Sequence, residues 1–466
     1  MRNPKPLRMP PSSAPSRLPL QRIAQTWWPL AASWLLMGAE LPALAAVVAR
    51  LPEPEVNLAA YGGIVFPLAL MIEAPIMMLL TASTALCKDW DSYLMVRRFM
   101  MRISALLTAL HVLIAFTPLY YVVAVDLLGA PAEIIEPGRT GLMIMTPWTW
   151  SIAYRRFHQG VLIRFGHSRA VGLGTMLRLS ADAVVLATGY LLGTVPGIVV
   201  ATSTVIAGVI TEAAFVGIIV QPVLRNQVQR APIVEPPLEF QALMSFYIPL
   251  ALTSLLNLLV QPIGSAALSR MPLPLESLAV WPVISGLIFM LRSLGIAYNE
   301  VVVALLDEPQ SASSLRRFAH LLAISTTLLL LGVVATPLAE LWFGRISALS
   351  PPLMMLAQQA LWLALPIPAL SAIQSWYQGV IVHYRNTRGI TEAVAVFLLT
   401  TSAVLAAGVA WGMVTGLYVG LAAFALANVA QTAWLWVRSR PAVERLQARD
   451  AQGAAMQPFP SPAVNE

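Results

Sequence analysis

The chain consists largely of long apolar runs separated by short polar stretches. Each run has about 20 residues or more, the length that a helix needs to cross a bilayer. None shows the ten-residue alternation that is typical of a membrane β-barrel. We therefore predict about twelve transmembrane helices, at 25–49, 58–86, 99–125, 141–163, 170–193, 197–221, 243–268, 276–306, 318–343, 354–382, 390–412 and 415–437.

Proline and glycine recur inside these apolar runs. In water they would argue against helices, but in a membrane neighbouring helices and polar side chains can satisfy the freed backbone groups. The first run is too long for the core of a signal peptide. We therefore expect an uncleaved first helix behind a basic, proline-rich tail.

The composition agrees with a membrane protein, because 58% of the residues are hydrophobic and 11% are charged, against roughly 45–50% and 25% in soluble domains. The formal net charge of +7 comes from basic residues that gather in alternate loops. By the positive-inside rule these loops and both termini are cytoplasmic. The basic excess is thus a topology signal, and we predict no nucleic-acid partner. We expect the protein to lie in the inner membrane of a cell. The loop residues are Lys88, Arg97, Arg98, Arg164, Arg169, Arg225, Arg230, Arg316, Arg317, Arg385 and Arg388.

The two halves of the chain repeat one another. Arg50 falls on Arg270 at a shift of 220, and the Gln-Gly pair at 159–160 falls on that at 378–379 at a shift of 219. Six prolines align with prolines, whereas 36 prolines in 466 residues would align about once by chance. We infer an internal duplication with about six helices in each half.

An even number of helices per half makes both halves enter the membrane in the same direction. The predicted fold is all-α and integral to the membrane, with two parallel six-helix repeats related by a pseudo-two-fold axis. Two such lobes enclose a cleft near the middle of the membrane, and rocking them opens it to alternate sides, which favours transport. We divide the chain into a cytoplasmic tail (1–22), a first lobe (23–221), a cytoplasmic linker (222–242), a second lobe (243–437) and a disordered tail (438–466).

Ionisable side chains within the spans are candidate functional groups, because each costs about 2.5–3.5 kcal/mol to insert. Glu40 lies two residues before Pro42, and the corresponding place in the seventh span holds Gln261 and Pro262. A proline frees a carbonyl group and permits a bend. We predict that Glu40 couples transport to a cation or proton and that both prolines are hinges. The alternative is a satisfied carboxylate beside an ordinary kink.

Opposite charges lie at nearly equivalent positions of the two halves. Glu73 and Arg292 are 219 residues apart, and they could pair across the cleft or find partners within their own lobes. Arg178 and Asp182 are four apart on one helix face, which favours a structural pair. The predicted ion-coupling residues are thus Glu40, Glu73 and Glu212, and the predicted substrate-cavity residues are Asn257, Gln261, Arg292, Arg178, Asp182 and Glu300.

No motif indicates catalysis or a metal site. The five histidines lack metal-ligand spacing, a P-loop is absent, and Cys87 is the only cysteine. We therefore predict no enzyme activity and no cofactor. A proton or sodium gradient is the expected source of energy.

Several motifs resemble those of MATE-type exporters, members of the multidrug/oligosaccharidyl-lipid/polysaccharide (MOP) flippase superfamily. One is the segment 158–170, which begins His-Gln-Gly-Val and is repeated at 377–388. A closer resemblance is to the progressive ankylosis branch, through the motifs at 245–251, 261–263 and 111–116. Together these motifs touch most of the chain.

The resemblance implies twelve helices in two lobes around a central cavity. It implies an acidic coupling residue in the first helix, where Glu40 is the matching carboxylate. The progressive ankylosis branch is linked to export of small organic and phosphate-bearing anions, for which Arg292 and Arg178 are the candidate contacts. This chain departs from many MATE proteins because it lacks a clear acidic residue in the core of the seventh or tenth span.

The leading hypothesis is a monomeric secondary transporter in the bilayer that exports small organic molecules by alternating access. The alternative is a flippase for a lipid-linked oligosaccharide or cell-wall precursor, which needs several cationic side chains in its cavity. Only Arg178 and Arg292 lie clearly within the membrane-embedded part of the predicted spans. A non-transporting scaffold is a third possibility. The major facilitator fold is the structural alternative, but its GxxxDRxGRR-like segment is absent from the loop at 87–98.

Overall fold

The computed structural model describes residues 18–308, 310–384 and 388–455, and within these ranges all regular structure is helical. The α-helices of the first half are α1 (Leu20–Gly38), α2 (Glu40–Val48), α3 (Pro54–Ala60), α4 (Phe66–Glu73), α5 (Leu79–Leu86), α6 (Trp90–Phe116), α7 (Leu119–Tyr121), α8 (Ala132–Ile144), α9 (Thr146–Arg164), α10 (Ser168–Leu192) and α11 (Gly197–Val223). Those of the second half are α12 (Phe240–Leu268), α13 (Pro274–Leu305), α14 (Ser311–Ala335), α15 (Leu338–Glu340), α16 (Pro351–Leu361), α17 (Pro366–His383), α18 (Arg388–Trp411) and α19 (Gly416–Ala455). Short π-helical or 3-10 turns are η1 (Tyr61–Val65), η2 (Ala74–Ile76), η3 (Val122–Leu127), η4 (Leu224–Val228), η5 (Leu341–Ile346) and η6 (Trp362–Ala364).

Among the described residues, eleven helical segments are long and apolar enough to cross a membrane. A further segment, α8 with α9, lies between the third and fourth of them in the chain. It is less apolar because α9 carries three arginines, Arg155, Arg156 and Arg164. The predicted all-helical, multi-pass membrane fold is therefore confirmed.

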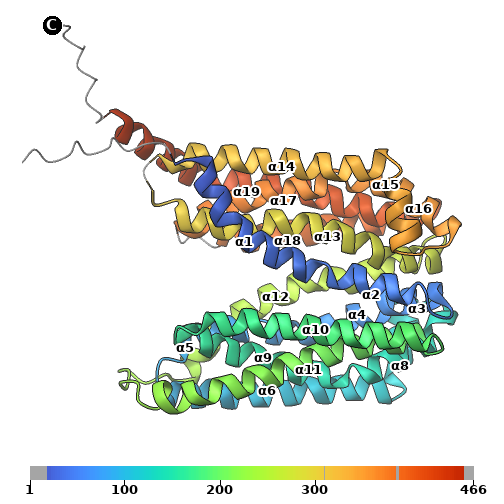
Figure 1. The fold of residues 1–466 in the computed structure, drawn as a ribbon, viewed down its shortest axis with the longest axis horizontal. Helices are drawn as coiled ribbons and strands as arrows, with labels where there is room; N and C mark the ends of the chain where they lie inside the picture. Colours follow the sequence, from blue (N-terminus) through green and yellow to red (C-terminus); the bar gives the residue numbers. More distant parts are fainter. Residues whose placement is uncertain (1–17, 309, 385–387, 456–466) are drawn as a thin grey trace, which may run out of the picture.

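Most helices of the two halves form two bundles that lie close together at one end of the molecule and diverge toward the other, and α1 lies along the bundle of the second half (Figure 1). The first span of each half packs against the second span of the other half, α1 on α13 and α12 on α4. Trp27 donates a hydrogen bond to the Leu294 carbonyl (2.9 Å), and Tyr247 donates one to the Pro75 carbonyl (2.5 Å). The halves are thus joined by their first helices as well as by the linker.

The structure repeats itself at the offsets found in the sequence. The amide of Ile198, at the start of α11, donates to the side chain of Asn57 (2.9 Å). In the second half the amide of Leu417, at the start of α19, donates to the hydroxyl of Ser277 (3.2 Å). Both contacts satisfy an N–H group that has no partner within its own helix. The turns η3 and η5 also lie 219 residues apart, and the predicted repeat is confirmed in three dimensions.

Two arginines tie the halves together at the end where the bundles converge, at the right of Figure 1. Arg50 follows α2 and donates hydrogen bonds to the backbone carbonyls of 345–346, in η5 of the second half. Its repeat counterpart Arg270 donates to the carbonyls of 126–128, at η3 of the first half. Carbonyls at the end of a helical segment lack partners and attract cations. Each half therefore supplies the cation that caps the other.

The linker is fastened to the start of α6 by Asp89. Its carboxylate accepts from the amide of Ser92 (2.9 Å), and the Ser92 hydroxyl accepts from the amide of Asp89 (3.1 Å), which forms a capping box. The carboxylate also accepts from the amide of Val234 in the linker (2.9 Å). Burial acts to raise the pKa of Asp89, but these hydrogen bonds outweigh it and lower the pKa below its ordinary value. Their stabilising effect is present at neutral pH and is lost as the pH falls through the lowered pKa.

The C-terminal segment differs from the prediction of disorder at 438–466. Helix α19 continues to Ala455, while 456–466 lie outside the described residues. Leu446 is buried in a cluster with Leu306, and Arg449 donates to the Leu306 carbonyl (2.9 Å). These contacts stabilise the helix beyond its apolar part. The tail predicted at 1–22 is helical from Leu20, and 1–17 lie outside the described residues.

We expect the double variant Arg50→Ala/Arg270→Ala to weaken closure at the converging end. Spin labels on cysteines introduced at Glu133 and Pro352, which are repeat counterparts at that end, should report longer and broader distances by electron paramagnetic resonance. The native Cys87 is buried and should label poorly.

The matched control is Arg139→Ala. Arg139 lies at the same end, but among the described residues it donates within its own half, to the carbonyls of Ala115 and Phe116 and to the Tyr121 hydroxyl. An equal change in this control, or unchanged distances in the double variant, would count against a closing role of Arg50 and Arg270.

Candidate functional site

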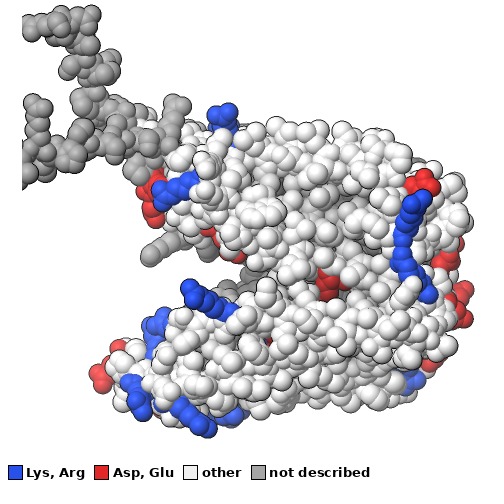
Figure 2. All heavy atoms as spheres, viewed as in Figure 1, with Lys and Arg blue, Asp and Glu red and all other residues white. Residues whose placement is uncertain are grey.

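A cavity of about 440 Å³ lies between the two halves. Figure 2 shows the cleft between the bundles, which is open at the end where α1 begins and α19 ends. The cavity is lined from the first half by residues of α1, α2, η1, α4, α9, α10 and α11, and from the second half by residues of α12, α13, α17 and α19. A change in the angle between the halves would therefore change the shape of this cavity.

The first span is broken beside the cavity. Helix α1 ends at Gly38 and α2 begins at Glu40, with Ala39 between them. Pro42 lies in the first turn of α2, where a missing N–H group costs least. Glu40 lies next to this break and lines the cavity.

Glycine and proline bring the two halves into close contact beside the cavity. A Cβ atom added to Gly286 of α13 would lie 3.0 Å from Pro42, and one added to Gly62 of η1 would lie 2.9 Å from Pro282. Any larger residue at either glycine would push the halves apart. Pro262, the other predicted hinge, lies inside α12, and its neighbour Gln261 lines the cavity.

Arg178 of α10 is shared by two carboxylates. Its Nη2 atom lies 2.6 Å and 2.5 Å from the two carboxylate oxygens of Glu40. Its Nε atom is 3.8 Å from a carboxylate oxygen of Asp182. Asp182 is buried behind Arg178, and a Cβ atom at Gly208 would collide with its carboxylate. The predicted Arg178–Asp182 pair is present, but the shorter contact is with Glu40, 138 residues away in the chain.

A second buried ion pair stabilises the bundle of the first half. Arg155 of α9 pairs with Glu212 of α11, and both side chains are nearly inaccessible to solvent. The second oxygen of Glu212 accepts from the Gln159 amide (2.8 Å). Glu212 is therefore satisfied within its own half and does not line the cavity.

The equivalent place in the second half carries no charge. Gln374 stands 219 residues after Arg155, and its amide donates to Asn428 (3.3 Å to Oδ1) and to Thr432 (3.0 Å). Five of the six charged groups that line the cavity come from the first half, and only Arg292 comes from the second. The duplicated scaffold thus has an asymmetric charge distribution.

Three charged groups at the cavity lack ion-pair partners among the described residues. One carboxylate oxygen of Glu73 and the Nε atoms of Arg156 and Arg292 are buried without a hydrogen-bond partner. Among the described residues, the one hydrogen-bond contact of the Arg156 side chain is with the sulfur of Met77, at 4.0 Å. Glu73 and Arg292 line the same cavity but form no ion pair with each other. Such groups are costly unless water or a ligand solvates them.

Three predicted cavity residues do not line the cavity. Asn257 and Glu300 are exposed elsewhere, and Asp182 is buried behind Arg178. Conversely, the sequence reasoning did not single out Arg155 and Arg156. The signal that could have found them is an arginine pair deep inside the predicted span at 141–163. Arginines that set the topology lie in the loops, so a pair within a span indicates a function.

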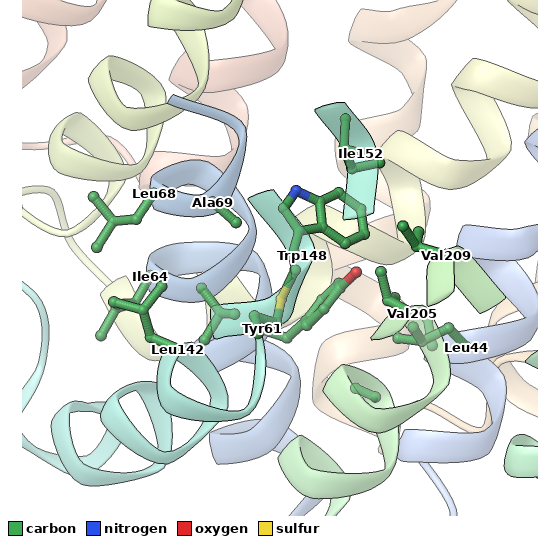
Figure 3. Packing of buried hydrophobic residues seen from close by; sticks show 14 of the residues in the cluster. Leu44, Tyr61, Ile64, Leu68, Ala69, Leu142, Trp148, Ile152, Val205 and Val209 are labelled. Atoms are coloured by element: carbon green, nitrogen blue, oxygen red, sulfur yellow. The ribbon is translucent and has the colours of Figure 1, made fainter. Parts of the chain in front are cut away.

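The remaining wall of the cavity is apolar and aromatic. Figure 3 shows Tyr61 and Trp148 side by side in the first half, with Leu44 and Val205 near the hydroxyl of Tyr61. The lining aromatic residues are Tyr61, Phe66, Trp148, Trp281, Phe289 and Phe424. Four arginines (Arg155, Arg156, Arg178 and Arg292) face two glutamates (Glu40 and Glu73) across this lining. Its chemistry suits an organic molecule with both an apolar part and a negative charge.

No protein-family model and no curated protein matches the chain. Among solved structures it is similar to an inward-facing multidrug resistance MATE family transporter of the MOP superfamily, with a TM-score of 0.65, 14% identity and coverage of 90% of this chain and 98% of that one. It is also similar to the lipid II flippase MurJ in an inward closed conformation (TM-score 0.67, 13% identity, 92% and 91% covered). A third neighbour is a mutant of the Vibrio cholerae MATE transporter VcmN (TM-score 0.63, 18% identity, 91% and 97% covered).

At these identities the similarity shows a shared fold. The resemblance to MATE and MOP proteins is therefore supported at the level of architecture. The progressive ankylosis branch stays a prediction.

We expect Glu212→Leu to destabilise the protein, because it leaves Arg155 buried without a counter-charge, at a cost of about 3–5 kcal/mol. The double variant Arg155→Met/Glu212→Leu should recover most of the loss, because no unpaired charge stays behind. Thermal unfolding of the purified protein in detergent measures both effects.

The control is Gln431→Leu, because Gln431 is the repeat counterpart of Glu212 and is only partly buried. This substitution should change the melting temperature little. Equal melting temperatures for Glu212→Leu and the native protein would contradict the structural role of the pair.

Proposed function

We propose that this protein is a membrane carrier that moves organic anions by alternating access between its two halves. The supporting observation is a cavity between the halves whose arginines outnumber its glutamates and include Arg156 and Arg292, two groups without ion-pair partners among the described residues. Desolvated cations are maintained at a cost in stability, which indicates a functional use. The fold shared with transporters is consistent with this proposal.

Alternating access requires that the cavity is closed at one end of the molecule and open at the other. The cleft opens at the end that we predict to be cytoplasmic from the positive-inside rule. The opposite end is held by Arg50, Arg270 and the glycine–proline contacts beside the cavity. Opening toward the other side would break the arginine–carbonyl contacts while the cleft closes.

The substrate class follows from the lining. Guanidinium groups bind carboxylates and phosphates through paired hydrogen bonds. The aromatic side chains supply apolar contact area of the kind that drug-sized ligands need. We infer a small organic or phosphate-bearing anion with an apolar portion.

Glu40 is our proposed coupling group. In the empty cavity its carboxylate pairs with Arg178. A substrate anion that engages Arg178 would compete with Glu40, and the released carboxylate would then favour a proton or a sodium ion. Because Glu40 begins α2, its release would act directly on the break in the first span. Glu73, which lacks a partner for one oxygen, is a second candidate for ion coupling.

A second candidate function is a flippase for a lipid-linked oligosaccharide or cell-wall precursor. From the sequence we expected only two arginines within the membrane, too few for this function. Four arginines line the cavity. A diphosphate group needs such a cluster of cations. One of the similar structures is that of a lipid II flippase.

We expect proteoliposomes to take up carboxyfluorescein, an organic anion, faster than ethidium, an organic cation. Arg156→Gln and Arg292→Gln should each lower the initial rate of anion uptake by roughly tenfold, because a charge-assisted hydrogen bond contributes about 1.5–3 kcal/mol. Fluorescence of the internal dye measures the rate. Arg164→Gln is the matched control, since Arg164 is an exposed residue at the end of the same helix α9.

Preference for the cation, or full activity of both cavity variants, would overturn the anion proposal. Movement of a fluorescent lipid-linked diphosphate across the bilayer without uptake of the soluble anion would favour the flippase.

We expect Glu40→Gln to abolish the stimulation of transport by an imposed proton or sodium gradient while substrate exchange continues. The amide keeps the size of the side chain but cannot ionise. Flux under each gradient separately, with Glu300→Gln as an exposed control, identifies the coupling ion. Gradient stimulation that persists in Glu40→Gln would remove Glu40 as the coupling group.

A further inference from the structure

A second cavity, of about 550 Å³, lies outside the central site, at the predicted cytoplasmic end of the second half. It is enclosed by the first turns of α14, by the end of α19 and by Trp376 of α17. Its lining residues are Ala312, Ser313, Arg316, Arg317, His320, Leu321, Ile324, Trp376, Val443, Gln447 and Asp450.

The end of α19 is held in place as one wall of this cavity. Arg449 donates to the Leu306 carbonyl (2.9 Å), and the Asp450 carboxylate accepts from the amide of Ala312 (3.1 Å). Arg449 and Asp450 also pair with each other (2.8 Å). The only acidic residue of the lining is therefore already neutralised, and it does not compensate the basic residues opposite.

Within the part of the chain that the structure describes, the two arginines of this cavity have no ion-pair partner. Arg316 and Arg317 form neither an ion pair nor a side-chain hydrogen bond among the described residues, and His320 lies one turn further along α14. The cavity therefore carries a net positive charge. An anionic group is the chemistry that complements it.

Below the arginines the same wall becomes apolar. Leu321 and Ile324 are 45% and 57% exposed, and because they belong to a helix that we treat as membrane-spanning, they face the acyl chains of the bilayer. Arg317 and Ile324 are seven residues apart, or about 10 Å along the helix axis. A ligand that contacts both needs a charged head and an apolar tail.

We propose that this cavity binds an anionic phospholipid of the cytoplasmic leaflet, with its phosphate between Arg316 and Arg317 and its acyl chains along Leu321 and Ile324. Basic pockets at the cytoplasmic ends of transmembrane helices suit lipid headgroups of this kind. A soluble phosphate compound would contact the arginines but make no use of the adjoining apolar wall. The adjoining corner holds the start of α1, because Arg22 pairs with Glu308 (2.6 Å), so lipid binding would also brace the first span.

The test titrates the purified full-length protein with phosphatidylglycerol or phosphatidylcholine and counts bound lipids by native mass spectrometry. We expect phosphatidylglycerol to bind more tightly. Arg316→Gln/Arg317→Gln should weaken its binding by at least about tenfold, since both cations that would face the phosphate are lost. Arg316→Lys/Arg317→Lys, which keeps the charge, should retain most of the binding.

The matched control is Arg97→Gln/Arg98→Gln, the equivalent exposed pair at the start of α6 in the first half. Loss of binding in this control as large as in the Arg316/Arg317 variant would show non-specific attraction and overturn the proposal. Equal affinity for the two lipids would overturn it as well. Full competition by soluble glycerophosphate would show that the cavity binds a free phosphate anion and not a lipid, and it would also overturn the proposal. Melting temperatures equal to the native value establish that each variant is folded.

Discussion

Charge held inside an apolar bundle is the constraint on which the rest of this structure depends. A carboxylate or guanidinium within the bilayer needs a counter-charge, a hydrogen-bond network or water. Arg155 and Glu212 meet this need inside the first half, where Gln159 completes the network. Arg178 meets it with Glu40 and Asp182. Among the described residues, Glu73, Arg156 and Arg292 line the cavity without such a pair.

The duplication gives two equivalent scaffolds, but the two carry different chemistry. The helix starts at Ile198 and Leu417 are tied down in the same way, and Arg50 and Arg270 cap carbonyls across the interface in the same way. In contrast, Gln374 occupies the place of Arg155. Contacts that set the geometry of the membrane domain are shared by both halves. Charges that would bind a solute or a coupling ion are concentrated in the first half.

The mechanical link between the halves is short and specific. Each half places its first span on the other, and glycine permits a proline to approach closely at two points. Such contacts favour rotation as rigid units, because close-packed surfaces have few alternative arrangements. The break at Ala39 sits at this junction, so a change at Glu40 and a change in the angle between the halves act on the same few residues.

The sequence by itself determined the membrane spans, the six-plus-six repeat and the presence of Glu40, Glu73, Arg178 and Arg292 within apolar segments. Hydropathy and internal alignment are one-dimensional properties, and the bilayer makes them decisive. Only the tertiary structure decided which charges meet: Glu40 pairs with Arg178, and Glu212 pairs with Arg155. It also placed Asn257 and Glu300 away from the cavity. These pairings depend on how each helix is rotated about its axis and how closely it packs on its neighbours. A nearly continuous run of apolar residues has no helical periodicity from which the rotation or the packing could be predicted. The helical end of α19 escaped prediction for the same reason, since its stability comes from contacts with residues more than a hundred positions away.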